Sequence, residues 1–542
     1  MPSTSEVLGI RGVWLLDLDV GGRVYRFASE AVSVTDASGD VYRYESGLGD
    51  LAVSVDGGAA KSLPVTISAG VDWALIEARG QSLELQTAIV RRWYPGTVLE
   101  RATVILRGLT EGAQYETIYD PMSVTVSRSP ARDAKLVPDA QAVVDSSTFP
   151  RVATGYSIGD KAQGAAYPLI IGAPGHDPKA ANPRPAVPAL AADFQAGLSD
   201  STLVIADRRI QAATVVLENA TLHNFSTAVP VLQREDNLGR TYSYVDFASA
   251  VPQLGGEGDE YFVGFQADAV YGGGTMYRGE LVRGAGDVIR FLLEEHSNID
   301  YDRGRFDAVA DWLNQYKIDG YINARQEAWA WIESEILKWL QVVVVDGVDG
   351  IYLRPVNFAA TTTDAVMWLQ APKNARRQGQ IAKIREPIYN EFAFDYRAQR
   401  GGSKYFDRRM LSASAGGLSG FGQYLGTVTD ERVFASYLCA RSQADFGIRP
   451  WNGASKSIWD DATAGLILQG MAERYTYPKR AARYVGGSEL EVLERGQVVI
   501  VSDEEVHLDE HIAIVEGITI GGAEVALDLI LVDHPVHDRR AL

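Results

Sequence analysis

Residues 467–533 read ILQGMAERYTYPKRAARYVGGSELEVLERGQVVIVSDEEVHLDEHIAIVEGITIGGAEVALDLILVD. The pattern predicts a helix that stops at the Tyr477–Lys479 run, because proline cannot continue a helix. Apolar runs rich in β-branched residues follow at 498–501 and 512–520, and glycines separate them. Such runs are typical of antiparallel strands joined by tight turns. Apart from one motif considered below, nothing in this stretch suggests catalysis, so it indicates an architectural module.

Composition places the whole chain among globular proteins. Its 542 residues predict roughly three to four domains. Hydrophobic residues make up 46% and charged residues 22%, which is ordinary for soluble domains and argues against wholesale disorder. With 51 basic and 70 acidic side chains the net charge is −19. This balance argues against a protein that wraps nucleic acid, because such binding needs Lys and Arg to displace counterions.

The cysteine count and the length of the apolar segments limit the classes of protein to which the chain could belong. Cys439 is the single cysteine of the sequence, so neither an intrachain disulfide nor a cysteine-based zinc finger is expected. The N-terminal residues lack a basic region followed by a long apolar core, and no run of 18 apolar residues occurs. We therefore expect cytoplasmic synthesis, without Sec export, an integral membrane segment or a cofactor.

The fold class predicted from the pattern is mainly β with α insertions. Short apolar runs alternate with turn residues between Val13 and Val126, which indicates a barrel or sandwich. The tip DASGD at 36–40 predicts a hairpin there. Two small β-barrel domains are expected to flank a central β module and a helical unit. The expected divisions are a β-barrel-like domain at 1–130, a Pro/Ala-rich connector at 131–200, a central β module at 201–285, a helical insertion at 286–345, a β-rich segment with a Gly-rich loop at 346–428, two helices at 429–478 and a β-barrel domain at 479–542.

Several segments inside these divisions carry their own predictions. The prolines between Pro174 and Pro188 predict an extended, exposed connector. Apolar spacing predicts three successive helices after Gly286, the third beginning at an N-cap on Asn323. The run VVVVDGVDGIYLRPV predicts a hairpin, and ASAGGLSGFGQYLG at 413–426 predicts a flexible loop.

One motif spells the order of a metallopeptidase class. His507–His511 reads H-x-x-E-H, in which both histidines must lie on one face of a helix to bind zinc. These five residues lie between two strand-like runs, so we expect an acidic connection between strands. Neighbouring carboxylates at Glu294–Glu295, Asp460–Asp461 and Glu504–Glu505 leave a glycosidase as a less favoured alternative, because the geometry of a carboxylate pair defines such a site.

Three further features have a structural and a functional interpretation. The tryptophans of 323–340, which are Trp329, Trp331 and Trp339, favour core packing, although the position of Trp331 predicts exposure of at least one of them. Cys439 lies on a predicted helix, and a small buried side chain is favoured over a nucleophile. Gly284–Gly286 opens a helix and is interpreted as a capping turn, with an anion site as the alternative. No catalytic, cofactor-binding or metal-binding residue is assigned.

Three parts of the sequence match patterns of a known protein family. The C-terminal order of an aromatic-Pro-basic run, a G-x-V-V-x-V-x-D turn and an I-x-x-V-E strand is similar to that of tail hub proteins of long-tailed phages. The matching residues are Tyr477, Pro478, Lys479, Gly496, Val498, Val499, Val501, Asp503, Ile512, Val515 and Glu516. The segment at 14–48 resembles the opening of tail-tip proteins of non-contractile, siphophage-type phages, and AYPLIIGAPG at 166–175 resembles the entry to their central module. The helical block at 286–345 has no counterpart in this resemblance.

The resemblance implies a structural virion protein and not an enzyme. It implies a homotrimeric tail-tip or baseplate hub, in which two β-barrel domains per subunit form a ring of pseudo-sixfold symmetry. The implied partners are a distal tail protein or tail tube ring above and a central fibre or spike below. Genomic DNA would pass through the lumen without specific binding during DNA ejection, and assembly would take place in the bacterial host cytoplasm. A tail-associated hydrolase of cell wall or surface glycan and a receptor-binding tail module are the alternatives.

Overall fold

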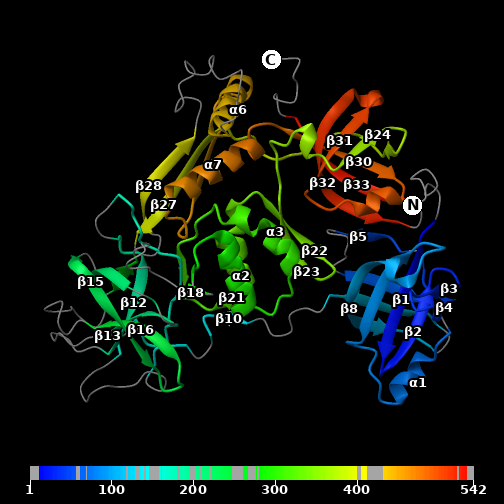
Figure 1. Ribbon diagram of the computed structural model, residues 1–542, viewed down its shortest axis with the longest axis horizontal. Helices are drawn as coiled ribbons and strands as arrows, with labels where there is room; N and C mark the ends of the chain where they lie inside the picture. Colours follow the sequence, from blue (N-terminus) through cyan, green and yellow to red (C-terminus); the bar gives the residue numbers. More distant parts are fainter. Residues whose placement is uncertain are drawn as a thin grey trace.

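The computed structural model describes residues 11–49, 51–55, 62–68, 70–117, 120–128, 135–139, 142–145, 158–159, 161–179, 183–193, 202–207, 210, 212–218, 221–246, 260–265, 276–277, 280–399, 404–411, 431–521 and 524–533. The protein is a multidomain, mostly β structure with helices inserted in its middle, which confirms the predicted fold class (Figure 1). The Gly-rich segment predicted as a loop at 413–426 lies outside the described residues. Among the helices of these ranges, none has the length and apolar character needed to cross a membrane.

The N-terminal sheet has eight strands. They are β1 (Val13–Val20), β2 (Arg23–Ala28), β3 (Val32–Thr35), β4 (Val41–Ser46), β6 (Ser62–Ile67), β7 (Thr87–Trp93), β8 (Thr103–Gln114) and β9 (Met122–Ser127). Their spatial order is β3-β4-β2-β1-β7-β8-β9-β6, with α1 (Trp73–Ala78) and η2 (Leu99–Arg101) in the connections. The predicted hairpin at DASGD is confirmed, because Val32 pairs with Tyr44 and Val34 with Tyr42. Alternate residues of β6 are buried, as expected of a strand with one face on a core.

The C-terminal sheet is the module that residues 467–533 predict. Its strands are β24 (Met367–Gln370), β25 (Ala375–Arg377), β30 (Lys479–Gly486), β31 (Val498–Asp503), β32 (Leu508–Ile520) and β33 (Val525–Val532). They lie in the order β24-β31-β32-β33-β30-β25, and β26 (Ala382–Lys383) pairs with β30. The turns η4 (Thr362–Asp364), η7 (Ser488–Val492) and η8 (Glu504–Val506) belong to its connections. The predicted antiparallel strands are confirmed by the β31–β32 and β32–β33 pairings.

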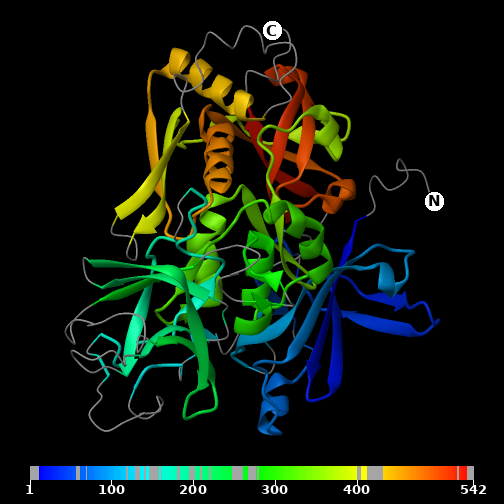
Figure 2. The same ribbon diagram turned by 60° about the vertical axis from the view of Figure 1, so that its left-hand side comes forward.

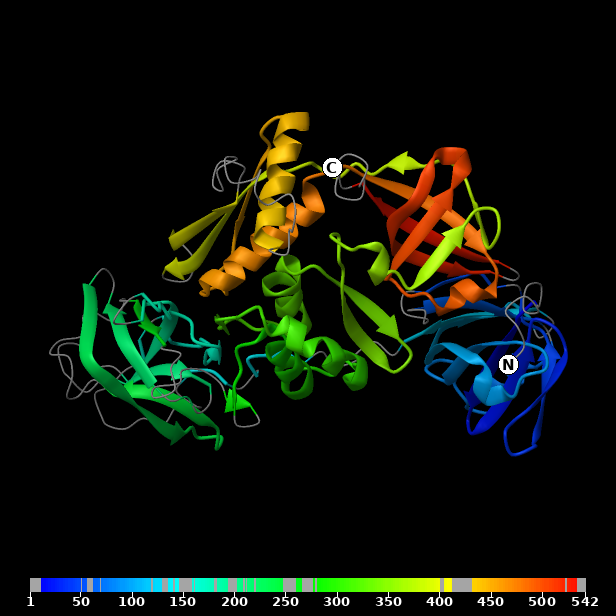
Figure 3. The ribbon, with the colours of Figure 1, turned by 45° about the horizontal axis from the view of Figure 1, so that its top comes forward.

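These two sheets share one apolar core. The strand β5 (Val53–Val55) leaves the N-terminal module and pairs with β32, where Val55 faces Ile518 and Val53 faces Ile520. A single cluster of buried side chains contains Trp14 from β1 and Leu527 from β33. Figures 1 and 3 show the N-terminal sheet, in blue, directly beside the C-terminal sheet, in red. The two ends of the chain thus pack into one body.

The central β module is a closed barrel. It contains β12 (Val187–Asp193), β13 (Thr202–Ala206), β14 (Ala212–Glu218), β15 (Thr221–Glu235), β16 (Thr241–Asp246) and β17 (Tyr261–Gly264). They close in the order β12-β13-β16-β15-β14-β17. Five of these six strands lie within the segment 201–285, and β12 precedes it. Figure 2 shows the barrel on the side opposite the N-terminal sheet, with the helical unit between them.

The helical unit and a small sheet fill the middle of the molecule. The helices are α2 (Ala285–His296), α3 (Arg303–Leu313), α4 (Ala328–Glu335), α6 (Glu431–Phe446) and α7 (Asp461–Tyr475), with the turn η3 (Leu337–Trp339). The small sheet has the order β28-β27-β29, formed by β27 (Glu391–Gln399), β28 (Lys404–Leu411) and β29 (Pro450–Ala454). The predicted hairpin is confirmed as β22 (Val342–Gly347) and β23 (Gly350–Pro355). Three short pairs complete the set, namely β10 (Leu136–Val137) with β21 (Gln326–Glu327), β11 (Leu169–Ile171) with β20 (Gly320–Ile322), and β18 (Met276–Tyr277) with β19 (Glu280–Leu281).

The predicted N-cap at Asn323 is wrong. The third helix begins at Ala328, because Gln326 and Glu327 form β21 and pair with Val137 and Leu136 of β10. Residues with good helical spacing are therefore held in a strand by a partner from far away in the chain. Tertiary pairing outweighs local propensity here.

The exposed connector predicted at Pro174–Pro188 is also wrong in its described part. Pro174, Pro183 and Pro185 are buried, and β12 begins at Val187. The carbonyl of Pro174 accepts a hydrogen bond from Phe265 N at 2.9 Å. Proline is tolerated because these residues lie at the start and margin of a strand.

The shared core predicts joint unfolding of the two end modules. Ile518 is buried at the β5–β32 pairing, so Ile518→Ala leaves a cavity and should lower the free energy of unfolding by about 2–5 kcal/mol. Hydrogen exchange during urea unfolding should show the amides of both end sheets losing protection together. Val492→Ala, at a side chain that is 69% exposed, should change stability by less than about 0.5 kcal/mol. Loss of protection in the C-terminal sheet alone would contradict the shared core.

Candidate functional site at the joints between modules

A buried ion pair lies between the N-terminal and C-terminal sheets. Arg92 of β7 is 2% exposed, and its Nη2 donates to the carbonyl of Gly521 at 3.0 Å. Its Nε lies 3.9 Å from Glu491, whose carboxylate also accepts a 2.5 Å hydrogen bond from Tyr94. Burial raises the pKa of Glu491 above its ordinary value, although Tyr94 and Arg92 oppose the shift. The guanidinium stacks on Trp14, 4.6 Å from the ring centroid. Stacking and ion pairing together hold the guanidinium in one orientation between the two sheets.

A second joint ties the helical unit to the C-terminal sheet through Glu494. Its carboxylate accepts hydrogen bonds from Arg305 Nη1 of α3 at 2.7 Å and from Tyr352 of β23 at 2.8 Å. Arg354 of β23 forms a third contact with the same carboxylate. Burial alone would raise the pKa of Glu494, but the hydrogen bonds from Arg354, Tyr352 and Arg305 hold it below its ordinary value. Three donors from two elements therefore converge on one acid.

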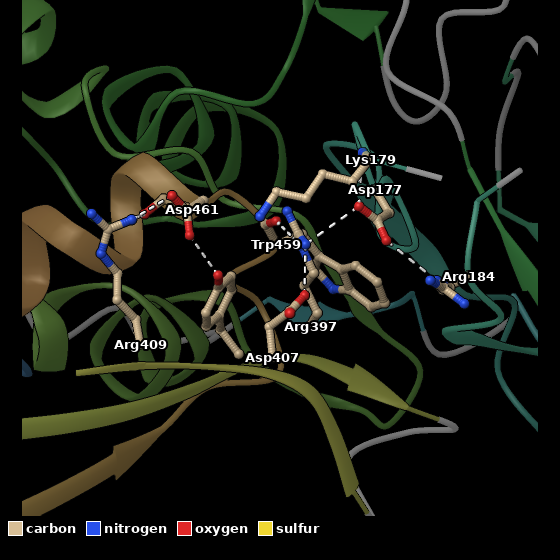
Figure 4. Close-up of polar contacts among 9 residues, drawn as sticks. Asp177, Lys179, Arg184, Arg397, Asp407, Arg409, Trp459 and Asp461 are labelled. Carbon is tan, nitrogen blue, oxygen red and sulfur yellow. Dashed lines mark hydrogen bonds and ion pairs between the residues drawn. The ribbon is translucent and has the colours of Figure 1, made fainter. Parts of the chain in front are cut away.

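The third joint, around Arg397, connects the barrel to the small sheet (Figure 4). Arg397 of β27 is 1% exposed and has a φ of 60°, a conformation that is strained in residues other than glycine. Its Nη1 lies 2.6 Å from Asp407 of β28 and 3.3 Å from Asp177, which precedes the barrel. Its Nε donates to the carbonyl of Trp459 at 2.9 Å. The contacts compensate for the backbone conformation and orient the guanidinium toward three separate segments.

The residues beside Arg397 extend this joint to α7. Asp177 also accepts from Arg184 Nε at 3.3 Å, so both ends of the segment that enters the barrel meet at one carboxylate. Tyr396 donates to Asp461, the first residue of α7, at 2.6 Å. Arg409 of β28 contacts the same carboxylate. The barrel, the small sheet and α7 are thus held in one polar network, and nothing in its geometry requires a substrate.

The H-x-x-E-H motif does not form a helix. His507 follows η8 with a φ of 56°, and His511 lies within β32. The predicted connection between strands holds for His507 alone and is wrong for residues 508–511, which belong to β32. His511 Nε2 lies 3.1 Å from Asp533. Within the described residues, no group of three or more His, Cys, Asp or Glu side chains is arranged to hold a metal ion.

The neighbouring carboxylates have separate structural partners. Glu294 accepts a hydrogen bond from Tyr301 at 2.6 Å, while Asp460 caps α7 by accepting from Thr463 N at 2.8 Å. Glu505 is 82% exposed and lies 3.1 Å from Arg377. These contacts give Glu294, Asp460 and Glu505 roles in capping or cross-linking.

The remaining candidates belong to the core. Trp331 and Trp339 are buried, which confirms the core interpretation for both, and Trp329, which donates to Glu333 at 2.9 Å, is the partly exposed one of the three. Cys439 is buried, and burial raises the pKa of its thiol to about 12, which leaves it protonated and unreactive at neutral pH.

The turn at Gly284 is a helix cap. Gly284 is the N-cap residue of α2, and a Cβ there would stand 2.2 Å from Asn314 Oδ1. That oxygen accepts a hydrogen bond from Asp287 N at 3.1 Å, so a side chain of this chain caps the helix where an anion would bind. The predicted capping turn is confirmed.

Sequence reasoning missed Arg92, Glu494 and Arg397. Each is a single charged residue in a chain with 121 such residues, counting 51 basic and 70 acidic side chains. Their partners lie between 10 and 429 positions away, so no local spacing marks them. A positive φ at an arginine has no sequence signature either.

Comparisons with known proteins give a consistent but distant set. No family model matches the sequence, and no curated protein matches it. Three matching solved structures are a tail protein from Neisseria meningitidis MC58, the 43 kDa tail protein of prophage MuSo2 from Shewanella oneidensis, and prophage tail protein gp18 from Listeria monocytogenes EGD-e. Each is 9% identical to this chain, with TM-scores of 0.37, 0.32 and 0.22. They cover 95%, 95% and 63% of this chain and 96%, 98% and 87% of their own, and at these TM-scores we draw neither fold nor function from them.

The Glu494 joint predicts a stability difference that depends on pH. Glu494→Gln keeps the shape but removes the charge, so the free energy of unfolding at pH 7 should fall by about 1.5–3 kcal/mol. The folded-state pKa is lowered, so this stabilisation is complete above the ordinary value of 4.5 and is lost as pH falls through the folded-state pKa. Denaturation of both proteins across that range measures the difference. Glu505→Gln serves as the exposed control, and a difference independent of pH would contradict the assignment.

The Arg397 joint predicts an energetic coupling across modules. Arg397→Met removes the cation that pairs with Asp407 and one of the two cations that pair with buried Asp177, which should cost about 3–5 kcal/mol of unfolding free energy. In a double-mutant cycle with Asp177→Asn, the coupling energy should be about 0.5–3 kcal/mol. Arg408→Met, at a side chain that is 52% exposed on the neighbouring strand β28, is the control. A coupling energy of zero would show that the barrel does not depend on Arg397.

Proposed function

We propose that this chain is a structural virion protein, a trimeric tail-tip or baseplate hub of a siphophage-type bacteriophage. It joins the sixfold tail tube to a threefold central fibre or spike and gates the DNA channel. A distal tail protein or tube ring binds above it. The C-terminal aromatic-Pro-basic run and the strands that follow support this proposal through their resemblance to hub proteins.

The observation that carries the proposal is the joint core of the two end sheets. Each subunit brings two β modules into one rigid body through β5 and β32. Three such subunits place six β modules around an axis, which meets a sixfold ring while keeping threefold symmetry. Such a body needs fixed joints between modules, and the Arg92, Glu494 and Arg397 joints supply them.

A role without catalysis follows from the use of the charged residues. The carboxylates singled out in the sequence cap helices or pair with basic residues. In the proposed ring, the net charge of −19 has an electrostatic role. Carboxylates that line the lumen repel phosphate within about 8 Å at physiological salt, so DNA passes without adhering. The proposal includes the statement that part of the acidic charge faces the lumen.

The proposal predicts a defined oligomer. Purified protein should reach three times the 58.9 kDa of one chain, either alone or after addition of tail tubes. Sedimentation velocity measures the mass, and averaged images of tails should place the chain on the axis with threefold symmetry. Cell-wall zymography tests the alternative of a hydrolase, and adsorption to host cells tests the alternative of a receptor-binding module. A chain that remains monomeric on tails, or lies off the axis, would overturn the hub.

A further inference from the structure

A cleft of about 710 Å³ lies between the β22–β23 hairpin and the C-terminal sheet. It does not contain any of the three joints described above, although Arg495 beside the Glu494 joint borders it. Residues Val342–Val344 of β22 form one wall, and Ile514 and Ile530 of the sheet form the floor. Its size is in the range of clefts that enclose a ligand or a short segment of chain.

The surfaces of the cleft are apolar where they face one another. Val343, Phe358, Ile514 and Ile530 belong to one apolar cluster on the outer face of the C-terminal sheet. Val343 and Ile530 are only partly buried in it. The outer face of a β sheet that meets water is normally polar, so this face has apolar surface available beyond what the hairpin covers.

The strand β22, which borders the cleft, is paired along one of its two edges in the described part of the chain. In the part of the chain that the structure describes, β22 forms a ladder with β23 alone. The far edge of β23 is bridged by Tyr301, which pairs with Ile351. An edge strand beside an apolar face is the arrangement to which an extended segment adds as a further strand.

Three polar atoms in the lining have no hydrogen-bond partner within the described chain. They are Oε1 of Gln341, Nε of Arg474 and Nε of Arg483. Gln341 is 8% exposed, so its amide oxygen is buried as an acceptor without a donor. Buried polar groups of this kind are almost always satisfied in a complete structure. A peptide main chain offers both the N–H that Gln341 needs and the carbonyl that the arginines need.

The basic residues of the cleft are paired with acidic residues of the chain, and Arg474 and Lys479 share Glu386. Lys479 lies 2.6 Å from Glu386, Arg483 lies 3.5 Å from Asp528, and Arg495 lies 3.6 Å from Glu516. A phosphate or another multivalent anion would have to break these pairs. The remaining capacity is for uncharged hydrogen bonds and apolar contact, which favours an extended protein segment over an anionic ligand.

We propose that this cleft docks an extended apolar segment of another protein, which adds to the edge of β22 and covers Val343 and Ile530. Its main chain satisfies Gln341 and the two arginine Nε groups. The interaction does not depend on the trimer, so it stands or fails separately from the hub proposal.

The test uses the full-length protein and a labelled hexapeptide of alternating Val and Thr, acetylated and amidated at its ends. Fluorescence anisotropy should show saturable binding. N-methylation of alternate peptide nitrogens and Gln341→Leu should each weaken binding by about tenfold, the equivalent of one buried hydrogen bond. Gln378→Leu, at an exposed amide outside the cleft, should leave binding unchanged. Hydrogen exchange should show new protection in β22 when the peptide is bound.

Three results would overturn the proposal. One is the absence of peptide binding by protein whose thermal unfolding shows a native fold. Another is equal affinity for the N-methylated peptide, or for Gln341→Leu with unchanged unfolding. The third is protection of β22 from hydrogen exchange in the free protein, because residues of the same chain or of a second copy already fill the cleft. Sedimentation at several concentrations distinguishes these two causes.

Discussion

The apolar core shared by the two end sheets is the constraint on which the rest of the structure depends. Residues near Val53 pair with residues near Ile518, so about the whole length of the chain lies between two strands of one ladder. The entropy of closing so long a loop grows only slowly with its length, and the buried surface of two sheets outweighs it. The barrel and the helical unit must therefore leave this body and return to it. Both ends of the segment that contains them are anchored in this body.

The ion-pair joints fix the orientation of the modules relative to one another, whereas the apolar core holds the modules together. Apolar contact is not directional, and it allows neighbouring modules to slide. The guanidinium of Arg397 and the carboxylate of Glu494 each meet three groups in fixed geometry, which selects one orientation of the barrel and the hairpin. Burying such charges brings little net stability, so orientation is the better account of their presence. A body that repeats around an axis needs this orientation, because small angular errors would prevent closure of a ring.

Local patterns in the sequence predicted what local physics determines. Alternation at Val32 and Val34, and β-branched runs at 498–501, predicted strands because one face of each meets a core. Asn323 failed as a helix start because β10, nearly 190 positions earlier, holds Gln326 and Glu327 as a strand. Arg397 and Glu494 left no signal, because their partners are distant in sequence and charge is common in this chain. The joints are properties of the folded chain and become visible only with the topology.

The strong acidity of the chain limits how the proposed assembly can be held together. Each subunit carries −19, so three subunits meet against a repulsion that salt reduces but does not remove. The basic residues at the three joints are already used within the subunit, since Arg92, Arg305 and Arg397 have acidic partners. Attraction between subunits and tail partners must then come mainly from apolar surface and from strand edges. The cleft beside β22 offers both, so the proposed docking of an extended segment there is a contact that this charge balance favours.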